Sequence, residues 1–290
     1  MAPTTAVPEL RPRASIGAAA EHARQEDAMA RPKWRQLADD LAARIRDGVW
    51  TEGQALPQIR ELTAQGVGST TTVQAAYRAL ETEGLVRTVR GRGTFVRRRR
   101  PRIVREPQAR YQWEKDRRLL SEDERRADGI AEHETGLRQP QLGFNVQFEV
   151  VEAPPEIARR FEVPTTTRVL HRHHWTSSRA EGAAISVIDS WILHDVAARN
   201  PALLDSSREP WPGGSMHQFH TIGIEIAEIV DQISARPPTT EEAELLDLDP
   251  GTAVIIVKKS TYSTLGELVE FSDIVLPGDR FDLLYRIPLK

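Results

Sequence analysis

Cysteine is absent from the 290-residue sequence, which excludes disulfide bonds and thiolate metal sites. No uninterrupted apolar run approaches the ~18 residues of a membrane-spanning helix. The first residues also lack the apolar core of a signal peptide. We therefore expect a cytoplasmic protein with no membrane partner. Neither a Ser-His-Asp nor a phosphate-loop pattern occurs in a supporting context, so we expect no enzyme activity and no cofactor.

The formal net charge of −3 hides two segments of opposite sign. Residues 31–100 contain 14 Lys and Arg against 7 Asp and Glu, whereas residues 141–290 contain 13 against 22. A clustered basic surface attracts nucleic acid, and an acidic one does not. A chain of this length has room for two cores. The charges thus predict a nucleic-acid-binding domain followed by an acidic domain with another role.

Residues 1–30 are rich in Ala and Pro with little apolar periodicity, so we predict a disordered tail. Met29 stands just ahead of the first expected helix. One hypothesis is that translation starts there, and a functional tail is the rival; mass spectrometry of native protein distinguishes them. The first helix should follow Pro32 and end at Gly48, with an apolar stripe made of Trp34, Leu37, Leu41 and Ile45.

The stretch from Leu56 to Val96 reads LPQIRELTAQGVGSTTTVQAAYRALETEGLVRTVRGRGTFV. Two short helical patterns are separated by a small-residue turn. Ser69 suits the N-cap of the second helix and Gly84 its end. The apolar residues of that helix recur at i, i+3, i+4 and i+7: Val73, Ala76, Tyr77 and Leu80. A basic hairpin follows, and this order predicts a winged helix-turn-helix, whose second helix enters the major groove of DNA.

Together with the upstream segments WRQLADDL and IRDG, this stretch resembles the DNA-binding domain of GntR-type transcriptional regulators over residues 31–98. The resemblance implies that Arg60, Thr71 and Thr72 contact DNA. It also implies that a homodimer binds a short palindromic operator in double-stranded DNA. The expected DNA-binding set is completed by neighbours on the reading helix and by the tip of the hairpin: Ser69, Thr70, Gln74, Tyr77, Arg90, Gly91, Arg92 and Gly93.

Two positions depart from the family pattern. The family usually has Arg where Thr70 stands, and often Arg or Lys where Gln74 stands. Loss of two cations should change the operator sequence and weaken the phosphate contribution to binding.

A basic run, Arg97–Arg100 and Arg102, follows the hairpin. We interpret residues 99–105 as a solvated linker, with an added phosphate contact as the alternative. Residues 106–290 form the second expected domain.

The second domain contains an internal repeat. Ala158, Phe161, Val163, Thr167 and Val169 recur 85 positions later as Ala243, Leu246, Leu248, Thr252 and Val254. Each copy predicts a strand, a short helix, a strand and a hairpin return, at residues 184–193 and 269–276. Two such halves should pair into one mostly antiparallel sheet with helices on one side, an α+β fold with a cleft where the halves meet.

This pattern, with the ending LPGDRF at residues 276–281, resembles the UTRA domain. UTRA is the effector-binding domain of the HutC subfamily and has a chorismate-lyase-like fold. The resemblance implies a small-molecule effector held by Arg172 and His174, by Ser186 on the next strand and by Glu270, given a longer hairpin loop at residues 176–182.

Alternatives remain at these positions. Alternation places Arg172 and His174 on one strand face and His171 and His173 on the other, and because no clear third ligand accompanies them we expect no metal. Arg172 and Glu270 could instead form an internal salt bridge. Sugar-binding members have an acid and a tyrosine where Ile188 and Leu276 stand. This difference favours a less polar ligand than an amino-sugar phosphate, or no ligand.

Three functions are therefore open. The first is a dimeric repressor whose operator affinity changes with an effector. The second is a ligand-independent repressor, for example of a mobile element, and the third is a lyase acting on a chorismate-like acid.

Overall fold

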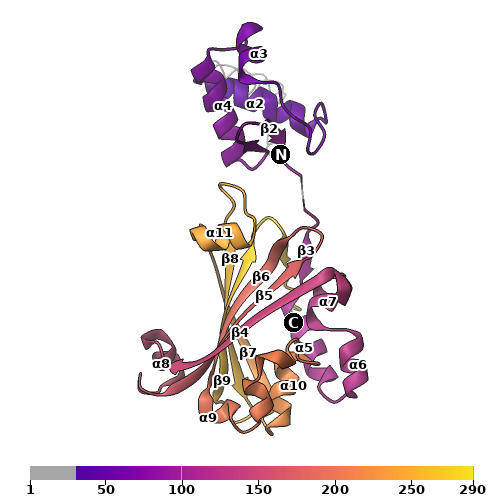
Figure 1. The fold of residues 1–290 in the computed structure, drawn as a ribbon, viewed down its shortest axis with the longest axis vertical. Coiled ribbons are helices and arrows are strands. Elements are labelled where there is room, and N and C mark those ends of the chain that lie inside the picture. Colours follow the sequence, from indigo (N-terminus) through magenta and orange to yellow (C-terminus); the bar gives the residue numbers. More distant parts are fainter. Residues whose placement is uncertain (1–30, 99, 290) are drawn as a thin grey trace, which may run out of the picture. The chain divides into compact units, whose positions relative to one another are not determined.

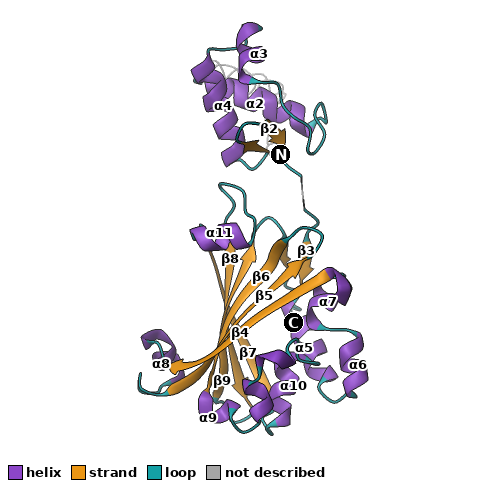
Figure 2. Cartoon of the chain, in the orientation of Figure 1, coloured by secondary structure: helices purple, strands orange, loops and turns teal. Residues whose placement is uncertain are grey.

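The computed structural model describes residues 31–98 and 100–289, and the chain divides into two compact units with the boundary after Arg98. Figure 1 and Figure 2 show the helices and strands of each unit. The tail expected at residues 1–30 lies outside the described residues. Within the described part of the chain, no helix is long and apolar enough to cross a bilayer.

The first unit is a winged helix-turn-helix. Its elements are α2 (Lys33–Arg46), α3 (Ile59–Ala64), α4 (Thr70–Thr82), β1 (Val86–Val89) and β2 (Gly93–Val96). The Ser69 hydroxyl accepts a hydrogen bond from the Thr72 backbone N–H at 3.2 Å, and Gly84 follows α4 with φ of 71°. The predicted cap and end of this helix are therefore confirmed.

The core of the first unit lies where α4 packs on α2. The predicted stripe of α4 is buried, as are Leu37 and Leu41 of α2, whereas Trp34 is only half-buried. Strands β1 and β2 pair antiparallel from Val86 with Val96 to Val89 with Gly93. The exposed turn of this hairpin needs a residue that tolerates positive φ, and Gly91 supplies it with φ of 76°.

The second unit is built on a six-stranded antiparallel sheet in the order β4-β5-β6-β9-β8-β7. Its two halves repeat one unit, a strand, a short helix and a hairpin, which confirms the predicted repeat. The first half contains β4 (Leu142–Glu152), α8 (Pro155–Phe161), β5 (Arg168–Ser178) and β6 (Ala183–Leu193). The second half contains β7 (Ile226–Arg236), α11 (Thr240–Leu245), β8 (Val254–Ser263) and β9 (Leu268–Pro277).

The halves meet along β6 and β9, which pair from Val187 with Val275 to Trp191 with Phe271. The remaining helices and turns connect the halves or precede them: α5 (Pro107–Arg117), α6 (Glu122–Ala127), α7 (Ile130–Thr135), α9 (His194–Ala197), α10 (Gly214–Thr221) and 3-10 turns at Gln139–Gln141, Pro201–Leu204 and Ser206–Arg208.

Helices pack against both faces of this sheet. Ile157 and Phe161 of α8 are buried with Val169. On the opposite face, Phe219 of α10 is buried with Leu170. The expectation of helices on one side was therefore wrong. Successive side chains of a strand point to opposite faces, so Val169 and Leu170 each need a covering layer.

Two local expectations also change. Strand β3 (Ile103–Arg105) lies within the expected linker and pairs in parallel with β10 (Phe281–Leu283). Arg100 pairs with Glu181 and Asp247, and Arg102 pairs with Asp282, so these two cations are engaged inside the second unit. Strand β5 continues to Ser178, which leaves a four-residue turn at 179–182 instead of the longer loop expected.

Candidate nucleic-acid interface and ligand cavity

The exposed face of α4 carries three of the side chains expected to contact DNA. Thr70, Thr71 and Gln74 are exposed, whereas Thr72 is half-buried. The Ser69 hydroxyl lies 2.9 Å from the hydroxyls of both Thr71 and Thr72. Ser69 therefore shapes the start of the reading helix, the part that approaches base edges and phosphates in this fold.

Exposed cations lie on the neighbouring helix and on the hairpin of the same unit. Arg60 is exposed on α3, and Arg90, Gly91, Arg92 and Gly93 are all exposed on the hairpin. Sequence reasoning missed Arg78, which is exposed on α4. Its position four residues after Gln74 was the signal that could have found it, because residues four apart lie on one helix face.

Tyr77 is a correction to the expected DNA-binding set. Its side chain is 5% exposed in the core, and its hydroxyl donates a hydrogen bond to the Pro57 carbonyl oxygen at 2.6 Å. Burial, with the nearby Glu61 carboxylate, raises the pKa of Tyr77 to about 12. The hydroxyl group therefore links α4 to the segment before α3, and the buried side chain does not contribute to the DNA-binding surface.

Replacing Tyr77 by phenylalanine therefore tests this structural role. We expect the free energy of unfolding of the first unit to fall by about 0.5–1.5 kcal/mol, the usual net value of one hydrogen bond. The ratio of affinities for operator and scrambled DNA should stay unchanged. Urea unfolding and a competition binding assay measure the two quantities, and a changed base preference would return Tyr77 to the DNA surface.

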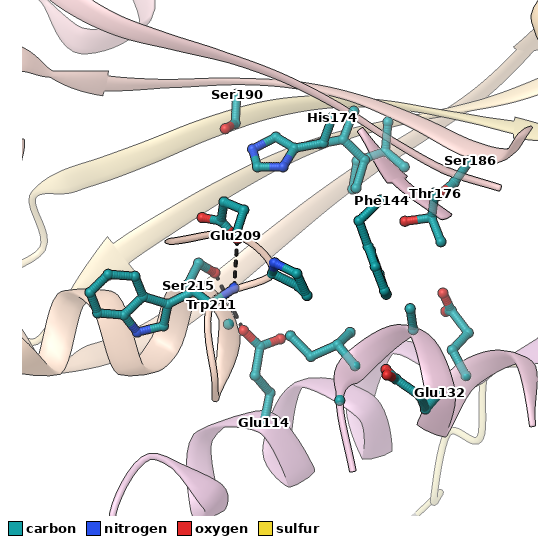
Figure 3. Close-up of a pocket in the computed structure, with 18 of the residues that line it drawn as sticks. Glu114, Glu132, Phe144, His174, Thr176, Ser186, Ser190, Glu209, Trp211 and Ser215 are labelled. Atoms are coloured by element: carbon teal, nitrogen blue, oxygen red, sulfur yellow. Dashed lines mark hydrogen bonds between the residues drawn. The ribbon is translucent and has the colours of Figure 1, made fainter. Parts of the chain in front are cut away.

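The second unit contains a cavity of about 310 Å³ where the two halves of the sheet meet. All four residues expected to bind an effector line it: Arg172, His174, Ser186 and Glu270. In Figure 3, His174, Thr176, Ser186 and Ser190 enter the cavity from the sheet, and Glu114 and Glu132 enter from helices on the other side. The walls mix ionic groups, hydroxyls and apolar side chains such as Phe144 and Ile188.

Arg172 is fully engaged at the base of this cavity. Its guanidinium donates to Ser190 Oγ at 3.0 Å, to Gln218 Oε1 at 2.7 Å and to Glu270. The second Glu270 oxygen lies 3.0 Å from Lys259 Nζ. Arg172 and Glu270 are 3% and 2% exposed, so the alternative of an internal salt bridge holds, now with Lys259 as a third member.

The charges in this triad set the ionisation of Glu270. Burial by itself raises the pKa of Glu270, but Lys259 and Arg172 outweigh it and hold that pKa below the usual range. A buried carboxylate is stable only with such compensation. The Glu270 carboxylate is therefore ionised at neutral pH.

His174 is an uncommitted polar group of the sheet wall. Burial, and then the positive charge of Arg172, lower the pKa of His174 to about 3, so its imidazole is neutral. The ring lies 5.6 Å from the Phe148 ring, and no hydrogen bond from it to another described residue is present. A neutral imidazole has one donor and one acceptor, which suits a polar ligand without charge.

The opposite wall was not foreseen from the sequence. Glu114 of α5 is buried and accepts a hydrogen bond from the Met216 backbone N–H at 3.3 Å, near the start of α10. Glu209 accepts from the Trp211 backbone N–H at 2.7 Å (Figure 3). It also accepts from Gln218 Nε2 at 2.8 Å. These carboxylates lie far from Arg172 in the sequence, and no local sequence pattern predicts that they line the same cavity.

His171 and His173 lie on the other face of β5, as alternation predicts. Both rings lie within hydrogen-bond distance of one Asp189 oxygen, at 2.8 and 2.9 Å. Among the described residues, no group of three or more His, Asp or Glu side chains is arranged to hold a metal ion. His217, on α10, accepts a hydrogen bond from Trp211 Nε1 at 2.9 Å.

Ile188 and Leu276 stand where sugar-binding members have an acid and a tyrosine, and the structure places these two residues in different surroundings. Ile188 lines the cavity, whereas Leu276 is fully buried in the core under β10. Of these two differences from sugar-binding members, only the one at Ile188 therefore changes the cavity wall directly.

Comparisons with known proteins match both units. Residues 33–96 match the model of bacterial regulatory proteins of the gntR family, and residues 145–282 match the UTRA domain. An HTH-type transcriptional regulator of Streptomyces coelicolor is 35% identical over 88% of this chain and 92% of its own length. The HTH-type transcriptional repressor NagR of Bacillus subtilis is 24% identical over 88% and 94%.

One more relative and one solved structure agree with these matches. The histidine utilization repressor of Klebsiella aerogenes is 24% identical over 88% of this chain and 94% of its own length. A crystal structure described as a GntR-family transcriptional regulator has a TM-score of 0.61 and 26% identity, and the match covers 90% of this chain and 99% of that one.

Proposed function

The chain belongs to the GntR family of bacterial regulatory proteins, in the HutC subfamily with a UTRA domain, and from this premise we propose that it is a dimeric repressor. In this proposal its affinity for a short palindromic operator changes when a small molecule binds the second unit. The coarser statement, that the chain is a transcriptional regulator, follows from the family itself. The finer statement rests on the two surfaces described above.

The observation that carries the DNA-binding part is the exposed face of α4, with its cap at Ser69 and the basic hairpin after it. The helix presents hydroxyls and an amide to base edges, while Arg60, Arg90 and Arg92 provide charges for phosphates. Two copies related by a twofold axis would place two such faces on the two half-sites of a palindrome.

The observation that favours an effector is the cavity beside His174 and Ser186. Its cations are already paired with carboxylates or carbonyl oxygens: Arg172 and Lys259 with Glu270, Arg105 and Arg110 with Glu134, Arg126 with Glu122, and Arg125 with the Leu120 and Pro212 carbonyls. A strongly anionic ligand would have to break such pairs, so the favoured ligand is small, neutral and polar. A ligand with higher affinity for one of two conformations would shift operator binding.

A ligand-independent repressor is the second candidate. The specific observation in its favour is that Arg172 and Glu270 satisfy each other, as two purely structural residues would. A lyase has no comparable support, and the matched relatives are transcriptional regulators.

The test is fluorescence anisotropy of the purified protein with DNA from upstream of its own gene, against scrambled DNA at one fixed salt concentration. Salt must be fixed because phosphate contacts alone give salt-dependent affinity. We expect a preference of ~10³-fold or more, the lower range for specific DNA binding. Equal weak binding to every sequence tried, including a randomised library, would contradict a sequence-specific regulator.

The same assay then separates the two candidates. Compounds that raise the melting temperature of the second unit are added to the operator complex. A compound that changes operator affinity, and fails to do so in a His174→Leu variant, supports the effector. Thermal stabilisation without any change in operator affinity supports the ligand-independent repressor.

A further inference from the structure

The reading helix has one polar stripe beside its buried one. Thr70, Gln74 and Arg78 follow each other at intervals of four, and Thr71 lies beside them. At 100° per residue these four positions span about a quarter of the helix circumference. All four side chains are exposed, whereas Val73, Ala76, Tyr77 and Leu80 on the other side are buried.

The hydrogen bonds around the stripe leave the Gln74 amide fully available, as they do the Thr70 hydroxyl. The Thr71 hydroxyl is paired with the Ser69 cap at 2.9 Å. Arg78 lies a further turn along the helix, and its Nε donates to the Gln74 carbonyl oxygen at 3.4 Å. The side-chain amide of Gln74 makes no hydrogen bond to any residue of the range 31–98 that the structure describes. Its oxygen and its NH₂ group are therefore both free to bind a ligand.

This amide matches one base edge. In the major groove adenine presents an acceptor at N7 and a donor at N6, so glutamine can accept from one and donate to the other at the same time. Guanine presents two acceptors there and matches arginine or lysine instead. We propose that Gln74 binds the N6 and N7 edge of one adenine in each operator half-site, and so sets the base preference at that position.

The inference rests on the proposed function, because it needs α4 to lie in the major groove. It goes further by naming the base and the side chain that reads it. It also gives a role to a departure from the usual family residue: an Arg at position 74 would favour guanine, so Gln74 changes the preferred base rather than only weakening the phosphate contacts.

The experiment is selection of binding sites from a randomised DNA duplex library with four full-length proteins: the wild type, Gln74→Ala, Gln74→Arg and Gln36→Ala. Gln36 is an exposed glutamine of α2 and serves as the matched control. Anisotropy with the selected duplexes, each with one base pair of the half-site replaced, then measures how much affinity depends on that position.

We expect the wild type to select one adenine per half-site whose replacement by guanine weakens binding about 5- to 150-fold. In Gln74→Ala the preference at that position alone should disappear, and in Gln74→Arg it should change to guanine. Gln36→Ala should select the wild-type sequence. Circular dichroism of each variant confirms that the first unit is folded.

Two other outcomes are distinguishable. If the wild type selects a defined half-site and Gln74→Ala selects the same one at every position, the assignment to Gln74 is overturned while the regulator stands. If the wild type selects no sequence at all, both the proposed function and this inference are overturned.

Discussion

Replacing Glu270 by alanine should lower the free energy of unfolding of the second unit by about 3–5 kcal/mol, the usual loss when one partner of a buried ion pair is removed. The carboxylate is 2% exposed and bridges Arg172 and Lys259. Without it, two positive charges would remain at the base of the cavity with no compensating anion. Urea unfolding followed by circular dichroism measures the loss.

Glu270→Gln is the matched control, because it keeps the shape and one acceptor but removes the charge. Its loss should be smaller than that of the alanine variant. Acid provides an independent check. Because the folded pKa of Glu270 is lowered, its contribution is complete above the ordinary carboxyl range near ~4.3 and disappears as pH falls through the folded pKa.

The wild-type second unit should therefore lose more stability in acid than the Glu270→Ala variant does. An alanine variant as stable as the wild type at neutral pH would show that the triad contributes no net stability. In that case the Arg172 and Lys259 charges must find other compensation.

Replacing Leu80 by alanine should abolish operator binding while leaving the second unit folded. Leu80 is 0% exposed at the centre of the core between α2 and α4. Such a truncation costs about 2–5 kcal/mol, which is comparable with the whole stability of a domain this small. Calorimetry of the full chain should show the transition of the first unit lowered or lost and that of the second unchanged.

Thr82→Ala is the control on the same helix. Thr82 is exposed, and a surface substitution of this kind changes stability by no more than about 0.5 kcal/mol. If Leu80→Ala lowered the transition of the second unit by the same amount as that of the first, the two cores would unfold as one. The division of the chain into two independent units would then be wrong.

Local patterns in the sequence were sufficient to predict α4, the repeated strand-helix-hairpin unit and the two faces of β5. The interval of Val73, Ala76, Tyr77 and Leu80 identified the buried side of α4, and Ser69 and Gly84 identified its ends. The repeat at 85 residues predicted two copies of one strand-helix-hairpin unit. Alternation along β5 separated Arg172 and His174 from His171 and His173. Each of these inferences depends on neighbours within a few residues or on a comparison of the chain with itself.

The sequence by itself thus determined the family, the winged helix-turn-helix, the repeated strand-helix-hairpin unit and the apolar side of α4. Only the tertiary structure decided that the Tyr77 hydroxyl bonds to Pro57, that helices cover both sheet faces, and that Glu114 closes the cavity opposite His174. The pair of Arg172 and Glu270 is separated by 98 positions and meets through the pairing of β6 with β9. The physical reason is that a side chain's period along its own element determines its face, whereas its partner depends on strand register and on helices contributed from distant parts of the chain.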